Sequence, residues 1–207
     1  MPGAVYAVSS DGLIHSLNEH TGGDLVPAAR FIRGNAKVED VISIANVVYA
    51  VTADDCGGAP NGVWSIDLKD NMVNEWKTDD ASVIGLAFGT DGTVYATTTN
   101  GIATLEEKTL KFKRQEHGPF ATAPLVFKFK DKEYVAAGNK SGHIFVMDPV
   151  SLDLLVNLSG GGAKLSSAFA SWEDSETKTP WLVAVKDSKV VAYKAVDKNG
   201  SDRKSVV

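Results

Sequence analysis

The chain has 207 residues, of which 43% are hydrophobic and 23% are charged, a composition typical of a globular protein with a sizeable core. Its formal charge of -5, from 21 basic and 26 acidic side chains, offers no general attraction for nucleic acid or an anionic lipid surface. No apolar run approaches the roughly 20 residues of a membrane helix, and Met1-Pro2-Gly3 leads into strand-like sequence without a signal-peptide pattern. We therefore expect no nucleic-acid partner, no membrane span and no signal peptide in this chain.

A hairpin opens the chain and returns along its length. Each copy has an apolar strand, a short turn of the Asp-Gly, Asn-Gly, Ser-Gly or Asp-Ser type, and a second apolar strand. The first strand of each copy contains an alanine on which the copies align: Ala7, Ala50, Ala96, Ala136 and Ala184. Because the intervals between these alanines are 43, 46, 40 and 48 residues, we expect them at equivalent places in five structural units.

Two further strands complete most of the units. An additional apolar strand precedes four of the hairpins, at 41–45, 82–88, 123–129 and 166–171. A shorter and more polar strand follows four of them, at 24–28, 73–77, 111–115 and 154–158. Four antiparallel strands repeating at this period are typical of a β-propeller blade, and no long helical periodicity competes. A large β-sandwich with coincidental spacing is the alternative.

We therefore expect an all-β propeller with no helix longer than about three turns. The predicted blade units occupy about 1–34, 35–79, 80–117, 118–160 and 161–207 of a single domain. The first unit lacks its opening strand, and the last lacks its closing strand unless 202–207 supplies one. The chain is therefore interpreted as an arc of a larger ring, with closure of five blades as the alternative. Open ends favour self-association through the incomplete end blades.

Residues 17–25, Leu-Asn-Glu-His-Thr-Gly-Gly-Asp-Leu, resemble the repeat of quinoprotein-type propellers, in which Leu-Asp ends a strand and a Thr-Gly turn follows. Asp67, with Trp76 nearby, and Asp148 stand at corresponding places in two later units. The family includes pyrroloquinoline-quinone (PQQ) dehydrogenases and the non-catalytic outer-membrane assembly lipoprotein. The resemblance implies a ring of seven or eight blades and a periplasmic or secreted location. For the enzymes of the family it also implies PQQ with a calcium ion.

The strongest departure from the repeat lies between Ala50 and Gly62, which are 12 residues apart where Ala7 and Gly12 are 5 apart. This insertion between the second and third strands of its unit contains the candidate ligand-binding residues Asp54, Asp55, Cys56, Gly57 and Gly58. In propellers that connection lies on the face that usually receives ligands, and loops commonly carry function. The alternative is an irregular turn in which the cysteine acts as a small hydrophobic residue.

No catalytic constellation is recognisable in the sequence. The single cysteine excludes an intrachain disulfide and a multi-cysteine metal cage, and the four histidines are scattered without the spacing of a zinc site. None of the carboxylates matches the base or the calcium ligands of the quinoprotein enzymes. We therefore expect a non-catalytic binding or scaffold module, without a cofactor, that receives a protein or small-molecule ligand on its loop face. A fragment of a PQQ-dependent alcohol or sugar dehydrogenase is the alternative.

Overall fold

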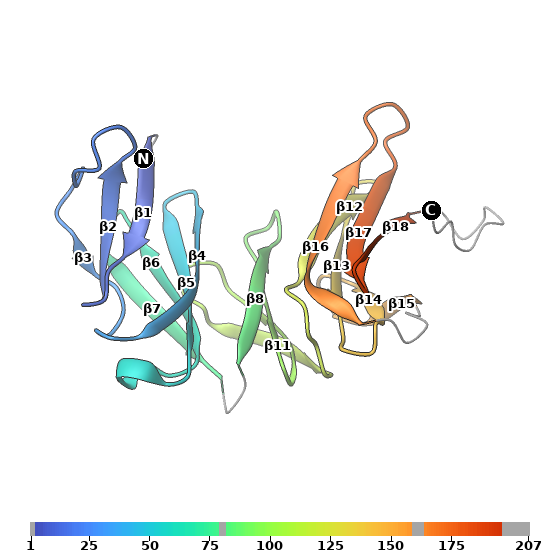
Figure 1. Ribbon diagram of the computed structural model, residues 1–207, viewed down its shortest axis with the longest axis horizontal. Helices are drawn as coiled ribbons and strands as arrows, with labels where there is room; N and C mark the ends of the chain where they lie inside the picture. Colours follow the sequence, from blue (N-terminus) through green and yellow to red (C-terminus); the bar gives the residue numbers. More distant parts are fainter. Residues whose placement is uncertain (1–2, 79–81, 159–163, 196–207) are drawn as a thin grey trace. The chain divides into compact units, whose positions relative to one another are not determined.

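The computed structural model describes residues 3–78, 82–158 and 164–195, and Figure 1 shows that these residues form β-strands joined by turns. The strands assemble into five sheets, each built from strands that are consecutive in the chain. One short 3-10 turn, η1 (Cys56–Gly58), is the only helical element of the described residues, and none of these residues forms a helix that could cross a membrane. The expected all-β architecture is therefore confirmed.

The five sheets are antiparallel, and the strand order in each follows the chain. The first sheet comprises β1 (Ala4–Val8), β2 (Leu13–Asn18) and β3 (Ala29–Arg30). The second comprises β4 (Lys37–Ile44), β5 (Val47–Ala53), β6 (Gly62–Asp67) and β7 (Met72–Lys77). The third comprises β8 (Val83–Phe88), β9 (Val94–Thr98), β10 (Gly101–Leu105) and β11 (Phe112–His117).

The fourth sheet comprises β12 (Leu125–Phe129), β13 (Lys132–Gly138), β14 (Ile144–Met147) and β15 (Leu154–Leu158). The fifth comprises β16 (Leu165–Glu173), β17 (Pro180–Lys186) and β18 (Lys189–Lys194). Within the described residues, the first and last sheets thus have three strands and the middle sheets have four, as expected.

The chain divides into two compact units. The first consists of residues 1–83 with 105–113, and the second consists of 84–104 with the residues from 114 onward. In the first unit, one apolar cluster joins the first two sheets. The first sheet contributes Tyr6, Val8 and Ile14, and the second contributes Val48, Ala50, Trp64 and Ile66. Because successive residues of a strand point to opposite faces, this pattern means that one face of each sheet packs on its neighbour.

Two apolar clusters hold the second unit together. One joins Tyr95 and Ile102 of the third sheet to Val135, Ala137 and Met147 of the fourth. The other joins Ala136 and Ile144 of the fourth sheet to Leu182 and Ala184 of the fifth. β12 and β16, the first strands of these two sheets, lie side by side (Figure 1). We call the face that contacts the preceding sheet the leading face and the face that contacts the following sheet the trailing face.

The structure corrects the alignment of the repeats at the fourth unit. Ala50 and Ala184 lie on leading faces, but Ala136 lies on a trailing face, and the leading position belongs to Ala137. The hydrogen bond that closes the hairpin turn confirms the shift. The backbone N–H of Asn139 donates to the carbonyl oxygen of His143 at 3.0 Å, and the backbone N–H of Ser9 donates to the carbonyl oxygen of Leu13 at 2.9 Å. A slip of one residue moves a side chain to the other face of a sheet. Sequence alone did not reveal it, because both positions hold alanine.

The acidic residues of the repeat cap the turns between third and fourth strands. Asp148 Oδ1 accepts hydrogen bonds from the backbone N–H groups of Val150 and Ser151 at 2.9 and 2.8 Å. Asn18 accepts two equivalent bonds in the first sheet, at 2.9 and 3.0 Å. The donors to Asp148 favour its charged form and hold the pKa of this carboxyl below its usual value. The aspartate of the repeat thus has a structural role as a turn cap.

Matched valines at equivalent places test the packing of sheet on sheet. Val48 is fully buried on the leading face of the second sheet, whereas Val5 is 54% exposed on the same face of the first. We expect Val48→Ala to lower the free energy of unfolding by about 2 kcal/mol, because two methyl groups are lost from a filled core. Val5→Ala should cost less than about 0.5 kcal/mol. Urea denaturation of both variants measures the difference, and equal losses would contradict this arrangement of faces.

The turn cap at Asp148 gives a pH-dependent prediction. Because the folded state lowers the pKa of Asp148, the charged carboxylate adds stability above the ordinary aspartate pKa, and this stability is lost as pH falls through the lowered pKa. We expect Asp148→Ala to cost about 1 kcal/mol at pH 7, because two backbone donors lose their acceptor. Asp148→Asn keeps an acceptor, so it should flatten the acid limb of the stability curve. An unchanged acid limb in both variants would show that the cap does not contribute.

Candidate functional site

The inserted loop between β5 and β6 is shaped by its backbone. Asp54, Asp55, Gly57 and Gly58 all have positive φ, at 59, 48, 62 and 70°. Gly57 is required by packing as well as by its φ, since a Cβ there would lie 2.3 Å from the carbonyl oxygen of Gly34. The loop is therefore closely packed against the connection between the first two sheets.

The polar groups of the loop have partners within the first unit. Asp54 Oδ2 pairs with Lys37 Nζ at 2.8 Å, and Lys37 also pairs with Glu39 at 2.8 Å, so the two carboxylates raise the pKa of Lys37. Asp55 Oδ1 accepts a bond from the backbone N–H of Asn61 at 3.0 Å, and Asp55 N–H donates in return to Asn61 Oδ1 at 3.3 Å. These bonds stabilise the turn.

Whether the loop can bind a cation depends on how many oxygen ligands its carboxylates can supply. Calcium takes six to eight oxygen ligands. Among the described residues, no group of three or more histidine, cysteine, aspartate or glutamate side chains is placed to hold a metal ion. Cys56 is a free, half-buried thiol beside Asp55. The structure thus brings the five predicted residues together in one turn, and their role in ligand binding stays a prediction.

A constellation that sequence reasoning missed lies in the first sheet. His15 Nδ1 is 3.0 Å from Asp24 Oδ1, and His15 Nε2 is 3.2 Å from Ser9 Oγ. A serine, a histidine and an aspartate in this order have the contacts of a nucleophilic triad. The signal was absent from the sequence because only the pairing of β1 with β2 and the bridge from Leu17 to Asp24 bring these residues together.

The internal repeat gives this constellation a structural explanation. Thr52 and Trp64 hold the corresponding places in the second sheet, and Trp64 Nε1 donates to Thr52 Oγ1 at 3.0 Å in the same manner. The Ser9 hydroxyl also contacts the carboxylate of Asp11 and the Leu13 carbonyl oxygen, so two oxygen acceptors compete for its one hydrogen. A hydroxyl beside the Asp11 carboxylate is poorly placed to develop an oxyanion. We assign these contacts to the hairpin of the repeat.

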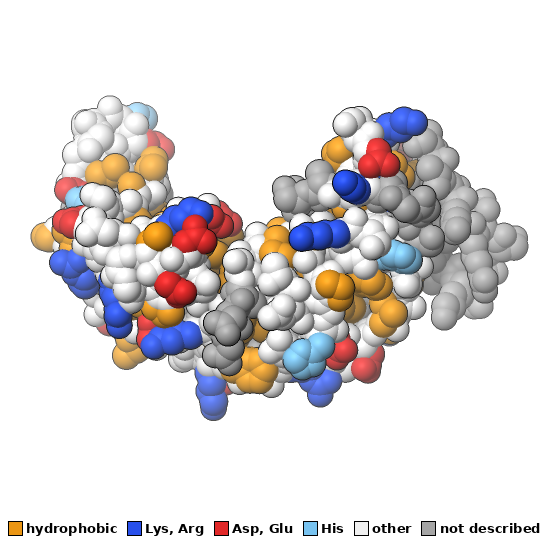
Figure 2. Space-filling view, turned by 60° about the horizontal axis from the view of Figure 1, so that its bottom comes forward, with side chains coloured by type: hydrophobic (Ala, Val, Ile, Leu, Met, Phe, Trp, Pro, Cys, Tyr) orange, Lys and Arg blue, Asp and Glu red, His pale blue; other side chains and the backbone are white. Residues whose placement is uncertain are grey.

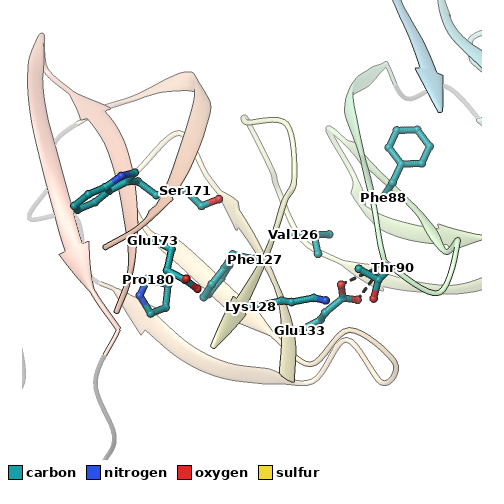
Figure 3. A pocket seen from close by; sticks show the side chains of 10 residues that line it. Phe88, Thr90, Val126, Phe127, Lys128, Glu133, Ser171, Glu173 and Pro180 are labelled. Carbon is teal, nitrogen blue, oxygen red and sulfur yellow. Dashed lines mark hydrogen bonds between the residues drawn. The ribbon is translucent and has the colours of Figure 1, made fainter. Parts of the chain in front are cut away.

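The second unit contains a pocket of about 310 Å³, shown in Figure 3. Its lining comes from the first strands of three consecutive sheets, from a turn that follows one of them and from the beginnings of two second strands, β13 and β17. Six of its side chains decide its chemistry, three with apolar surface and three charged: Phe88, Val126, Phe127, Lys128, Glu133 and Glu173. It lies at strand ends where first strands pass into second strands, whereas the inserted loop joins a second strand to a third.

The charged rim of the pocket is partly fixed by hydrogen bonds. The backbone N–H of Thr90 lies 3.1 and 3.2 Å from the two carboxylate oxygens of Glu133, as the dashed lines in Figure 3 mark. Lys128 is paired in register with Glu133 on the adjacent strand, so both signs of charge lie on one side of the pocket. Glu173 is exposed and lies 3.8 Å from Lys178. The pocket therefore offers apolar surface beside an ammonium group and carboxylates.

Charges of both signs are also interspersed over the face of the molecule that Figure 2 displays, with apolar side chains exposed between them. This mixture agrees with the small net charge of -5. A contiguous basic surface is the electrostatic mark of nucleic-acid binding. The described residues form no such surface on the displayed face.

Comparison with known proteins identifies the fold. No family model and no curated protein matches the chain. The extracellular domain of a hybrid two component system from B. thetaiotaomicron matches with a TM-score of 0.62 at 14% identity, over 96% of this chain and 25% of that one. BamB from Moraxella catarrhalis matches with a TM-score of 0.61 at 15% identity, over 97% of this chain and 56% of that one.

The C-terminal WD40 domain of Sif2 also matches, with a TM-score of 0.62 at 11% identity, over 93% of this chain and 52% of that one. The chain thus spans a quarter to about half of the length of these three structures. At such low identity the likeness shows the fold alone. Together with the five antiparallel sheets, it shows that the chain has a β-propeller fold.

Neighbouring glycines in the inserted loop provide a test of its packing. Alanine at either Gly57 or Gly58 requires a positive φ that costs about 1 kcal/mol. A Cβ at Gly57 also meets the backbone of Gly34 at 2.3 Å, whereas at Gly58 it meets only the Arg33 side chain at 3.5 Å. We expect Gly57→Ala to destabilise the protein by about 1–3 kcal/mol more than Gly58→Ala. Thermal unfolding measures the two variants, and equal shifts would mean that the loop is not packed as described.

Proposed function

We propose that this chain is a binding or scaffold module without turnover of its own. The observation that carries the proposal is the pocket of the second unit, where strand ends from three consecutive sheets combine apolar and charged side chains. A few polar groups beside apolar surface are typical of a ligand site. By contrast, Asp54 and Asp55 already have partners within the fold, and Ser9 and His15 belong to the hairpin of the repeat.

The ligand that fits this pocket has an apolar part and a charged end. Val126 presents apolar surface on the same side of β12 as the Lys128 ammonium group, and Phe127 presents its ring on the other side of this strand. Glu133 and Glu173 supply carboxylates for a cationic end. Either a small amphiphilic molecule or a protein side chain with such an end has this chemistry. The inserted loop from Asp54 to Gly58 is a second proposed contact for a partner.

The assignment to the PQQ-like repeat type, and the location that we propose with it, rest on the resemblance of the sequence repeat. The turn-capping residues Asn18, Asp67 and Asp148 support membership of the PQQ-like repeat type, because they occupy the place of the aspartate in that repeat. With that membership we propose a periplasmic or secreted location and one domain divided into the blade units given above. PQQ and calcium are implied only for the enzymes of the family and are tested directly below.

Matched probes of opposite charge test the pocket. Saturation-transfer NMR with phenylbutylamine and phenylbutyrate measures binding of the same apolar group with either charged end. We expect Lys128→Ala to weaken binding of the carboxylate and Glu173→Gln to weaken binding of the amine, because each loses its counter-charge. The double substitution Asp54→Ala and Asp55→Ala is the control and should leave both signals unchanged. If only this control weakens binding, the loop is the site and the pocket is not.

Turnover is tested on the same protein. The chain is titrated with PQQ and calcium, and dye reduction is then assayed with a panel of alcohols and sugars. We expect no substrate-dependent reduction. Saturable PQQ binding together with such reduction would overturn the proposal in favour of a quinoprotein dehydrogenase fragment.

A further inference from the structure

Two sheet faces lack the neighbour that equivalent faces have. On the leading face of the first sheet, Val5 is 54% exposed and Leu17 is half-buried, although their counterparts Val48 and Ile66 in the second sheet are fully buried. In the described part of the chain, no preceding sheet covers this face. It presents apolar side chains that the fold elsewhere removes from water.

Among the described residues, no following sheet covers the trailing face of the last sheet. Trp172 and Trp181 are paired in register, as are Val185 and Val190, so each pair shares one face. This face is opposite to that of Leu182, which packs on the fourth sheet. Trp172, Val185 and Val190 are 57%, 37% and 68% exposed. Large apolar side chains gathered on one exposed face mark an interaction surface.

We propose that these two faces bind each other between copies of this chain, leading face to trailing face. The internal repeat indicates what covers each exposed face, because every contact between neighbouring sheets within either unit joins a trailing face to a leading face. A second copy therefore supplies the type of face that each end lacks. The contact continues the packing that already holds the first two sheets together, for example Ile14 against Val48.

Charge disfavours the pairing of two trailing faces. The trailing face carries Lys194, whose Nζ lies 5.8 Å from the ring centroid of Trp181. The leading face carries Asp24, which is bridged to Leu17 and contacts His15. It also carries Arg30, which is paired in register with Leu13. Two trailing faces would bring like ammonium groups together, whereas a trailing face opposite a leading face brings Lys194 toward the face that carries Asp24. The resulting interface is head-to-tail, which closes into a ring or grows into a chain of copies.

Sedimentation velocity and light scattering of the 207-residue chain test the proposal. Across about 1 to 100 µM, we expect the mean mass of the wild type to rise with concentration, as mass action requires. Val5→Lys blocks the leading face and Val190→Lys blocks the trailing face, so each variant alone should remain a monomer. Both valines are mostly exposed, and circular dichroism should therefore show folded variants.

A mixture of the two variants gives the decisive measurement. Val5→Lys retains its trailing face and Val190→Lys retains its leading face, so an equimolar mixture should form a complex of one copy of each and stop there. Val150→Lys, at a 79% exposed valine in the turn before β15, is the control and should associate like the wild type. A wild type that stays monomeric at all concentrations, or a mixture without a complex, would overturn the proposal. So would single variants that associate as strongly as the wild type.

Discussion

The structure depends on the packing of one sheet face on the next. A strand presents alternate side chains to opposite faces, so a strand buried on both sides must place an apolar residue at nearly every position. β5 satisfies this demand, since Val47–Ala53 is buried throughout. Once such strands exist, each sheet has two apolar faces, and a single sheet cannot hide both from water. The succession of sheets follows from this constraint, and so does the exposure of one face on the first and on the last described sheet.

Polar groups mainly fix the turns that this packing requires. Asp148 and Asn18 cap turns between third and fourth strands, and Asp55 and Asn61 tie the inserted loop together. A carboxylate that accepts backbone hydrogen bonds compensates donors that would otherwise be unsatisfied. Many conspicuous polar residues of this sequence are therefore used within the fold. The inserted loop departs most from the length of the repeat, and its two aspartates also have partners within the fold.

The pocket of the second unit has a different origin. Its side chains come from strand ends and turns, where the sheets no longer pack on each other. Lys128 and Glu133 lie there in an ordinary cross-strand pair, and Thr90 adds a backbone donor from the preceding sheet. No local pattern distinguishes these residues from surface charges elsewhere. A fold of repeated strands can thus form a site from residues that no local sequence pattern marks individually.

The sequence by itself determined most of the strands, their turns and their period, because apolar alternation and Asp-Gly or Asn-Gly turns act over a few neighbouring residues. It also located the inserted loop and, within the described residues, the three-stranded first and last sheets. The strand expected at 24–28 was wrong, since the third strand of the first sheet is β3 (Ala29–Arg30). Only the tertiary structure decided which of Ala136 and Ala137 faces which sheet, since two adjacent alanines look alike until a neighbouring sheet contacts one of them. The partners of Asp54, the contacts of His15 and the pocket likewise required the fold. They depend on the positions of residues far apart in the chain, which no short-range pattern encodes.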